Sequence, residues 1–131
     1  MITPNIIKFS DEDRMRVVET IVYLSNKAID AGMNVIVSAL TANQEARVLI
    51  NNSIKNLIVG HVKCSIEECV RRDPKGLYEK ANKGEINTLI GINTVYVDPE
   101  NPDIILETET SSISYIVNNI EAYLNKYVMP L

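Results

Sequence analysis

The residues with the clearest chemical potential form one charged segment, Arg71-Arg72-Asp73-Pro74-Lys75-Gly76-Leu77-Tyr78. Within it, Arg72 and Lys75 are cations that could neutralise the charge of a phosphoryl group during its transfer. Asp73 lies between them and could hold an arginine of the segment, or it could cap a helix that begins at Pro74. The alternative interpretation is a solvated, charged loop without a chemical role.

The residues that follow make the pattern specific. Ala81, Gly84-Glu85-Ile86 and Gly91-Ile92 continue it without a gap. Taken together, the matched residues resemble the lid of adenylylsulfate kinases, whose usual pattern is R-D-P-K-G-L-Y-x-K-A-x-x-G-E-I-x-x-x-x-G-I. The resemblance implies a lid at about residues 72–95.

The resemblance also implies a role for each polar residue of this lid. Arg72 and Lys75 would be the catalytic cations, acting on the transferred phosphoryl group. Asp73 and Tyr78 would serve the lid itself, and packing is favoured over catalysis for Tyr78.

Three further segments carry the resemblance in collinear order. Phe9-Ser10-Asp11-Glu12-Asp13-Arg14 is similar to the family's G-F-S-x-E-D-R. Ala31-Gly32, followed by Val35-Ile36-Val37-Ser38, resembles A-D-A-G-x-x-V-I-V-S. Pro99-Glu100-Asn101-Pro102 resembles A-P-E-N-P. With the lid, these segments extend the resemblance over nearly the whole chain.

The first of these segments implies two substrate-binding residues. Phe9 would stack on the substrate base, and Arg14 would bind the substrate. The alternative for Phe9 is a hydrophobic staple before a helix cap at Ser10. The alternative for Arg14 is a surface ion pair with Asp11 or Glu12, which would contribute under about 1 kcal/mol.

Ser38, Leu40 and Thr41 are further candidates for substrate binding, because they end a predicted strand where ligands gather in open α/β sheets. Leu89 is a candidate by position only, since it stands where the family has a second base-stacking phenylalanine. Asn87 replaces a family lysine, and Gln44 replaces a family arginine. Loss of an aromatic platform removes about 1–3 kcal/mol per stacked base, so the acceptor could differ from adenylylsulfate.

Adenylylsulfate kinases transfer the γ-phosphoryl group of ATP to the ribose 3′-hydroxyl of adenylylsulfate, and they need Mg²⁺ and a phosphate cradle. In the family the cradle is G-x-x-x-x-G-K-[ST] and the likely base lies in D-G-D-N-x-R, but neither motif occurs in these 131 residues. We therefore expect ATP and Mg²⁺ for a full family domain and no tight binding of either by this chain alone. The missing half could precede Met1 in the same protein, be lost by truncation, or come from a partner.

The apolar pattern predicts an alternation of helices and strands. Helices are expected at residues 10–32, 43–56, 65–70, 74–83 and from 111 or 112 onwards, and strands at 34–40, 57–63 and 103–107. This order predicts an α/β fold with a three-layer parallel sheet. The resemblance implies the P-loop kinase type without its first two strands, as a single partial domain over residues 1–131. The absent P-loop strand would separate strands 34–40 and 57–63 and leave their edges unpaired.

The composition limits the partners. A formal net charge of −4 argues against nucleic-acid or membrane-surface binding. We find no secretory leader and no apolar run of membrane-spanning length, so we expect a cytoplasmic protein. A homodimer, or a partner supplying the P-loop half, is compatible with the sequence.

Two classes of function follow. The first is an ATP-dependent nucleotide kinase whose acceptor is adenylylsulfate, as in sulfate assimilation, or a related nucleotide such as cytidine diphosphoramidate, which a relative uses in bacterial capsule synthesis. This kinase would be inactive as the truncated chain. The second is a non-catalytic fragment, or a module that binds a nucleotide or partner.

Overall fold

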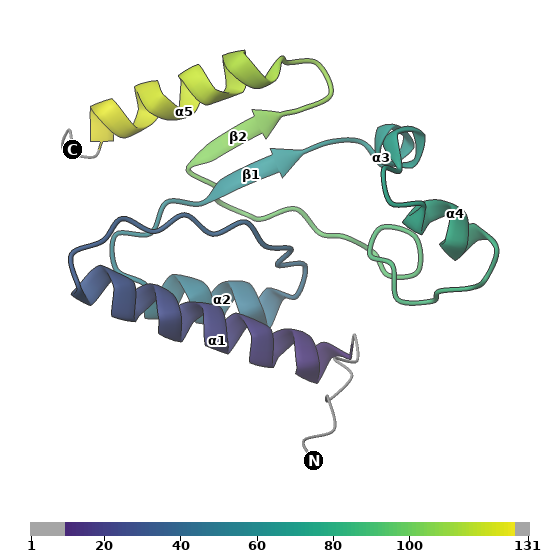
Figure 1. Ribbon diagram of the computed structural model, residues 1–131, viewed down its shortest axis with the longest axis horizontal. Coiled ribbons are helices and arrows are strands. Elements are labelled where there is room, and N and C mark those ends of the chain that lie inside the picture. The colour runs from purple at the N-terminus through teal and green to yellow at the C-terminus, as the bar shows by residue number, and fades with distance from the viewer. Residues whose placement is uncertain (1–9, 128–131) are drawn as a thin grey trace. The chain divides into compact units, whose positions relative to one another are not determined.

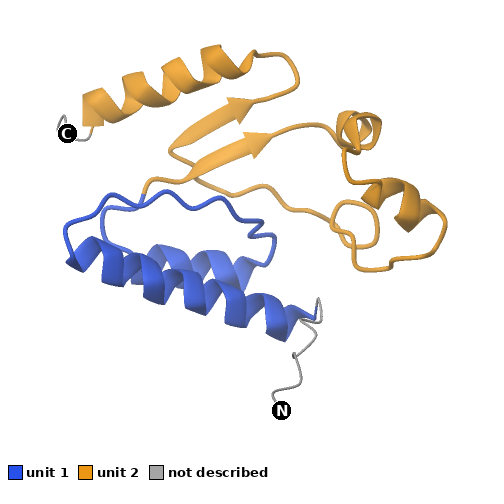
Figure 2. Cartoon of the chain, viewed as in Figure 1, with its two compact units in different colours: residues 1–57 blue, residues 58–131 orange. Residues whose placement is uncertain are grey.

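The computed structural model describes residues 10–127. The chain divides into two compact units, residues 1–57 and residues 58–131 (Figure 2). The expectation of a single partial domain stays a prediction. No helix within the described residues is long and apolar enough to span a membrane.

The first unit begins with α1, Asp11–Asp30. Ser10 is its N-cap, and the Ser10 side chain accepts a hydrogen bond from the Asp13 backbone N–H, as the sequence predicts. Three acidic residues in the first turn complement the positive end of the helix dipole. The chain leaves the helix through Gly32, whose φ of +80° favours glycine.

A second helix, α2 at Gln44–Ser53, packs against α1 (Figure 1). Their contact buries Val18, Val22 and Ala46, and this small cluster is the core of the unit. Asn43 caps α2 by accepting from the backbone N–H groups of Glu45 and Ala46. The unit is therefore a helical hairpin joined by residues 31–43.

The predicted buried strand at residues 34–40 is wrong for the described chain. These residues are exposed and form no strand, and Ile36 is 97% exposed. The segment has the apolar, β-branched composition of a parallel strand, but a strand requires a neighbour that accepts and donates its backbone hydrogen bonds. No described segment supplies that neighbour.

The second unit contains a two-stranded parallel sheet and three helices. Strand β1, Gly60–Lys63, pairs with β2, Ile104–Glu107, in the register Gly60↔Ile104. Both strands are shorter than predicted, since residues 57–59 and 103 lie outside the ladder. Helices α3, Ile66–Arg72, and α4, Leu77–Asn82, follow β1, and α5, Ile113–Tyr127, packs on β2 (Figure 1).

A matched pair of substitutions tests the contrast between the buried cluster and the exposed segment. We expect Val22→Ala to lower the free energy of unfolding by about 1–3 kcal/mol, because it removes buried apolar atoms. We expect Ile36→Lys to change it by less than about 0.5 kcal/mol, because that side chain is solvated. Urea denaturation of both variants checks this, and a large loss for Ile36→Lys would show that residues 34–40 are packed.

Candidate functional site

The candidate site lies in the second unit, where β1 and β2 end. The carboxyl ends of parallel strands are where ligands bind in open α/β sheets. Ser65 follows β1 and caps α3, because its hydroxyl oxygen accepts from the Glu68 backbone N–H at 3.2 Å. Thr108 and Glu109 follow β2. Short helix α3 thus starts at the same sheet edge at which β2 ends.

Two hydrogen-bonded links hold these strand ends together. The Ser65 backbone N–H donates to Glu109 Oε2 at 3.1 Å. The Thr108 hydroxyl and backbone N–H both donate to the Lys63 carbonyl, each at 3.0 Å. Lys63 Nζ lies 3.3 Å from Glu107 Oε1 at the last paired position of the ladder. The sheet edge is therefore fixed on both strands.

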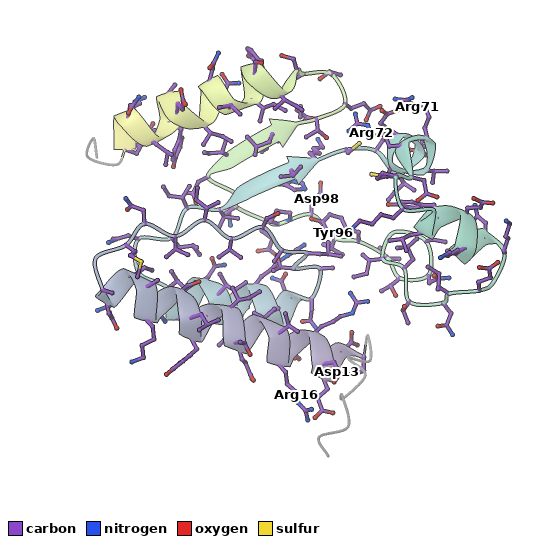
Figure 3. All side chains as sticks on the ribbon, viewed as in Figure 1. Asp13, Arg16, Arg71, Arg72, Tyr96 and Asp98 are labelled. Atoms are coloured by element: carbon purple, nitrogen blue, oxygen red, sulfur yellow. The ribbon has the colours of Figure 1, made fainter. Side chains whose placement is uncertain are left out.

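Arg72, a predicted catalytic cation, is held at this edge. Its Nε donates to Glu68 Oε1 at 2.7 Å, and its Nη2 donates to the Thr108 carbonyl at 2.8 Å. The side chain remains 41% exposed. Figure 3 shows Arg71 and Arg72 projecting from α3. The guanidinium is thus anchored to both its own helix and the end of β2, and it is still accessible to an anionic ligand.

Glu68 accepts hydrogen bonds from both arginines of α3. Arg71 donates to both of its carboxylate oxygens at 2.6 Å, and Arg72 shares one of them. These hydrogen bonds, first from Arg71 and then from Arg72, lower the pKa of Glu68 from 4.5 to about 2. One carboxylate faces two guanidinium groups, so the cluster keeps one net positive charge.

Glu68 is not among the site residues predicted from the sequence, because an acidic residue at a helix start is favoured there by the helix dipole alone. The signal was present in the spacing. Arg71 and Arg72 lie at i+3 and i+4 from Glu68, and residues at these separations meet on one helix face. The contact between Arg72 and Thr108 has no such signal, since these two residues are distant in sequence.

Asp73 binds the first turn of α4 from outside the helix, which begins at Leu77 with Gly76 as its N-cap and not at Pro74 as predicted. Its carboxylate accepts from the backbone N–H groups of Tyr78 at 3.2 Å and Glu79 at 3.0 Å. Burial alone would raise the pKa of Asp73, but the backbone N–H groups of Glu79, Tyr78 and Leu77 lower it overall. Of the two roles that the sequence left open for Asp73, these hydrogen bonds agree with capping of the next helix, although that helix starts later than predicted, and no described arginine pairs with Asp73.

The other predicted lid residues lie in the same unit. Lys75 is exposed in the turn before Gly76, whose φ is +63°. Tyr78 is half-buried beside Cys69, and burial first, then the Cys69 thiol, raises the pKa of Tyr78. Leu89 is half-buried in a turn, where its backbone N–H donates to Asn93 Oδ1 at 3.0 Å. No described contact joins Leu89 to Arg72.

Four of the predicted substrate-binding residues lie in the first unit. Arg14 is half-buried in the first turns of α1. Ser38 and Leu40 are exposed in the extended segment. The Thr41 carbonyl accepts from Arg47 Nε at 2.7 Å, which ties the end of the segment to α2. Phe9 lies outside the described residues.

A hollow of about 650 Å³ borders the sheet edge in the second unit. Its lining includes residues of β1 and β2 with the segment around Tyr96 and Asp98. His61 is buried there, with its ring beside Tyr96 and its Nε2 3.8 Å from Asp98 Oδ1. Residues 10–127 contain no group of three or more His, Cys, Asp or Glu side chains placed to hold a metal ion.

Comparison with known proteins identifies relatives. The family described as Adenylylsulphate kinase matches residues 4–107. The chain is 37% identical over 121 residues to the adenylyl-sulfate kinase of Staphylococcus epidermidis, which covers 91% of this chain and 61% of that protein. It is 39% identical over 118 residues to the adenylyl-sulfate kinase of Oceanobacillus iheyensis, with coverage of 88% and 59%. The chain therefore spans about 60% of the length of these curated relatives.

A solved structure shows the same fold. The Mycobacterium tuberculosis APS kinase CysC, in complex with AMPPNP and APS, matches with a TM-score of 0.81 and 31% identity, covering 91% of this chain and 70% of that chain. The resemblance drawn from the sequence is confirmed. The predicted α/β fold of P-loop kinase type, with a parallel sheet, is confirmed as well.

The Glu68 cluster predicts a pH dependence of stability. The pKa of Glu68 is lowered on folding, so its stabilising contribution is present above pH 4.5 and is lost as the pH falls towards about 2. We expect Glu68→Gln to lower the free energy of unfolding at pH 6 and to cost less at pH 3, where part of the contribution is already lost. Urea denaturation at both pH values is the measurement, with Glu67→Gln as the control. An equal cost of Glu68→Gln at the two pH values would contradict the assignment.

Proposed function

Since the chain belongs to the adenylylsulphate kinase family, we propose that it forms the lid-bearing and acceptor-binding part of an ATP-dependent nucleotide kinase. The reaction moves the γ-phosphoryl group of ATP to a hydroxyl group of adenylylsulfate or a related nucleotide. The observation that carries this proposal is Arg72, held at the carboxyl end of β2 within the R-D-P-K-G-L-Y segment.

The lid cations have distinct tasks in this proposal. Arg72 is anchored through Nε and Nη2, so it offers a pre-oriented positive charge to the phosphoryl group in transfer. Lys75 is exposed in the adjoining turn, where it can reach a bound nucleotide once the lid closes. Asp73 fixes the turn that carries Lys75, and Tyr78 packs the lid.

The acceptor nucleotide is bound by the residues to which the family resemblance gives a substrate-binding role. Phe9 stacks on the base, and Arg14 contacts its anionic group. Ser38, Leu40 and Thr41 are the further substrate-binding residues of the first unit. Leu89, in the second unit, stands where the family has a second base-stacking phenylalanine. Cytidine diphosphoramidate, the nucleotide linked above to capsule synthesis, is the alternative acceptor because the lost platform suited adenine.

The phosphate cradle for ATP comes from polypeptide outside these 131 residues. Neither G-x-x-x-x-G-K-[ST] nor D-G-D-N-x-R occurs in the sequence. A preceding segment of the same protein or a separate partner would supply both, and a homodimer without them would not. The described side chains do not fit a Mg²⁺ site, so we assign no step of the reaction on this chain to the metal ion. We place the assembled kinase in the cytoplasm.

A second candidate function is a non-catalytic module that binds a nucleotide or a partner. The exposed apolar segment at residues 34–40 favours it, because Ile36 and Leu40 are 97% and 64% exposed in a region with strand composition. Such a module would bind its partner through strand pairing and would show no phosphoryl transfer in any assembly.

The two neighbouring arginines offer a matched test of the catalytic role. In this chain assembled with a polypeptide that carries the P-loop, we expect Arg72→Lys to lower kcat about 10²–10³-fold, as for loss of one transition-state donor. We expect Arg71→Lys, which leaves the Thr108 contact in place, to lower kcat less than about tenfold. The measurement is transfer of radiolabel from γ-labelled ATP to adenylylsulfate.

The chain without that polypeptide is the control for this assay, and we expect it to show neither turnover nor tight binding of MgATP. Equal rates for the Arg72→Lys and parent assemblies would refute the catalytic role of Arg72. Absence of transfer in every assembly would favour the non-catalytic module.

The acceptor preference is a separate expectation. Asn87 and Gln44 replace two family cations, and each lost charged contact costs about 1.5–3 kcal/mol. A dianionic acceptor should therefore lose more affinity than a less charged one. We expect the assembled kinase to have a higher kcat/KM for a cytidine-diphosphate-linked acceptor than for adenylylsulfate. A preference for adenylylsulfate would show that other residues compensate for both replacements.

A further inference from the structure

We propose that Glu68 is a positioning residue, which holds the Arg72 guanidinium in the orientation that receives the transferred phosphoryl group. The inference rests on the proposed role of Arg72, and it adds a residue that this role requires. Glu68 itself does not touch the substrate. It acts through Arg72.

Two hydrogen bonds fix the orientation of the Arg72 guanidinium. Arg72 Nε donates to Glu68 Oε1 at 2.7 Å, and Nη2 donates to the Thr108 carbonyl at 2.8 Å. The guanidinium is planar, so two anchored nitrogens on different partners fix its plane. Nη1 donates to none of the described residues. The remaining donors therefore stay available on a side chain that is 41% exposed, as a group that must meet an anionic ligand requires.

Glu68 is itself held in place. The two nitrogens Nε and Nη2 of Arg71 bind the two carboxylate oxygens of Glu68 in a bidentate pair, both at 2.6 Å. The Arg71 side chain is 73% exposed, whereas the Glu68 side chain is only 14% exposed. A series of contacts thus links the exposed Arg71 to the end of β2. Arg71 binds Glu68, Glu68 binds Arg72, and Arg72 binds the Thr108 carbonyl.

This arrangement differs from an ordinary surface ion pair. An isolated exposed pair contributes little, because both side chains are flexible and solvated. Here a half-buried carboxylate accepts from two guanidinium groups, and one of them also reaches a backbone carbonyl that follows β2. Without Glu68, Arg72 would keep a single anchor at Thr108 and could rotate into solvent.

The helix provides its own matched control. Glu67 precedes Glu68 on α3 and is exposed, and it takes part in none of the ion pairs of the described residues. Glu67→Gln and Glu68→Gln therefore remove the same charge from neighbouring positions of one helix. Only the second removes the carboxylate that holds Arg72.

The test is NMR spectroscopy of the 131-residue chain with ¹⁵N-labelled arginine, in which Arg72→Lys assigns the Arg72 Nε–H resonance. In the parent we expect this proton to exchange slowly with water. In Glu68→Gln we expect exchange at least about tenfold faster, with the resonance moving towards that of free arginine. In Glu67→Gln we expect no change. Backbone amide signals of β1 and β2 report whether each variant folds.

Unchanged Arg72 Nε–H exchange in a folded Glu68→Gln variant would overturn the proposal. If that variant does not fold, Glu68→Asp serves instead, because its shorter side chain keeps the charge but cannot span both guanidinium groups. Faster Arg72 exchange in folded Glu68→Asp supports the proposal, and unchanged exchange overturns it.

The assembled kinase separates this proposal from the catalytic role of Arg72. We expect Glu68→Gln to lower kcat about tenfold with the KM for ATP nearly unchanged, and Glu67→Gln to change neither. If Arg72 has no catalytic role, Arg72→Lys leaves kcat intact while the exchange result for Glu68→Gln still holds. If only the positioning role is wrong, Arg72→Lys lowers kcat while Arg72 exchange does not respond to Glu68→Gln.

Discussion

The parallel pairing of β1 with β2 is the interaction on which the candidate site depends. Its register, with Lys63 opposite Glu107, brings the ends of two strands distant in sequence to one edge. Helix α3 begins at that edge because Ser65 caps it directly after β1. Thr108 is placed there by the end of β2, so its carbonyl lies within reach of Arg72. If the ladder shifted by one residue, the hydrogen bond from the Arg72 guanidinium to the Thr108 carbonyl would be lost.

Local elements could be predicted from the sequence, because their signals are local. The Ser10 cap and its acidic first turn specify α1, and the final helix was found from its apolar spacing. The parallel sheet was also predicted, although both strands are shorter than expected. Residues 34–40 were not predicted correctly. Their β-branched composition describes a buried strand, but composition does not tell whether a neighbouring strand is present.

The residues of the candidate site also divide into those that the sequence predicts and those that it does not. Arg72, Asp73 and Tyr78 were identified by their motif, and the family comparison supports that motif. The hydrogen bonds of Asp73 to the first turn of α4 agree with its predicted capping role, although α4 begins at Leu77 and not at Pro74. Glu68 was passed over although its spacing to two arginines was visible, because an acid at a helix start is usually solvated. The Thr108 contact depends on the strand register, which no local pattern encodes.

The central claim is that Arg72 meets the transferred phosphoryl group from the end of β2. The most direct measurement is a crystal structure of this chain assembled with a P-loop-bearing polypeptide, ADP, aluminium fluoride and a nucleotide acceptor. We expect Arg72 Nη1 to donate to a fluoride ligand while Nε still contacts Glu68 and Nη2 still contacts the Thr108 carbonyl. A structure in which the guanidinium points away from the fluoride, or in which another residue takes its place, would contradict the account.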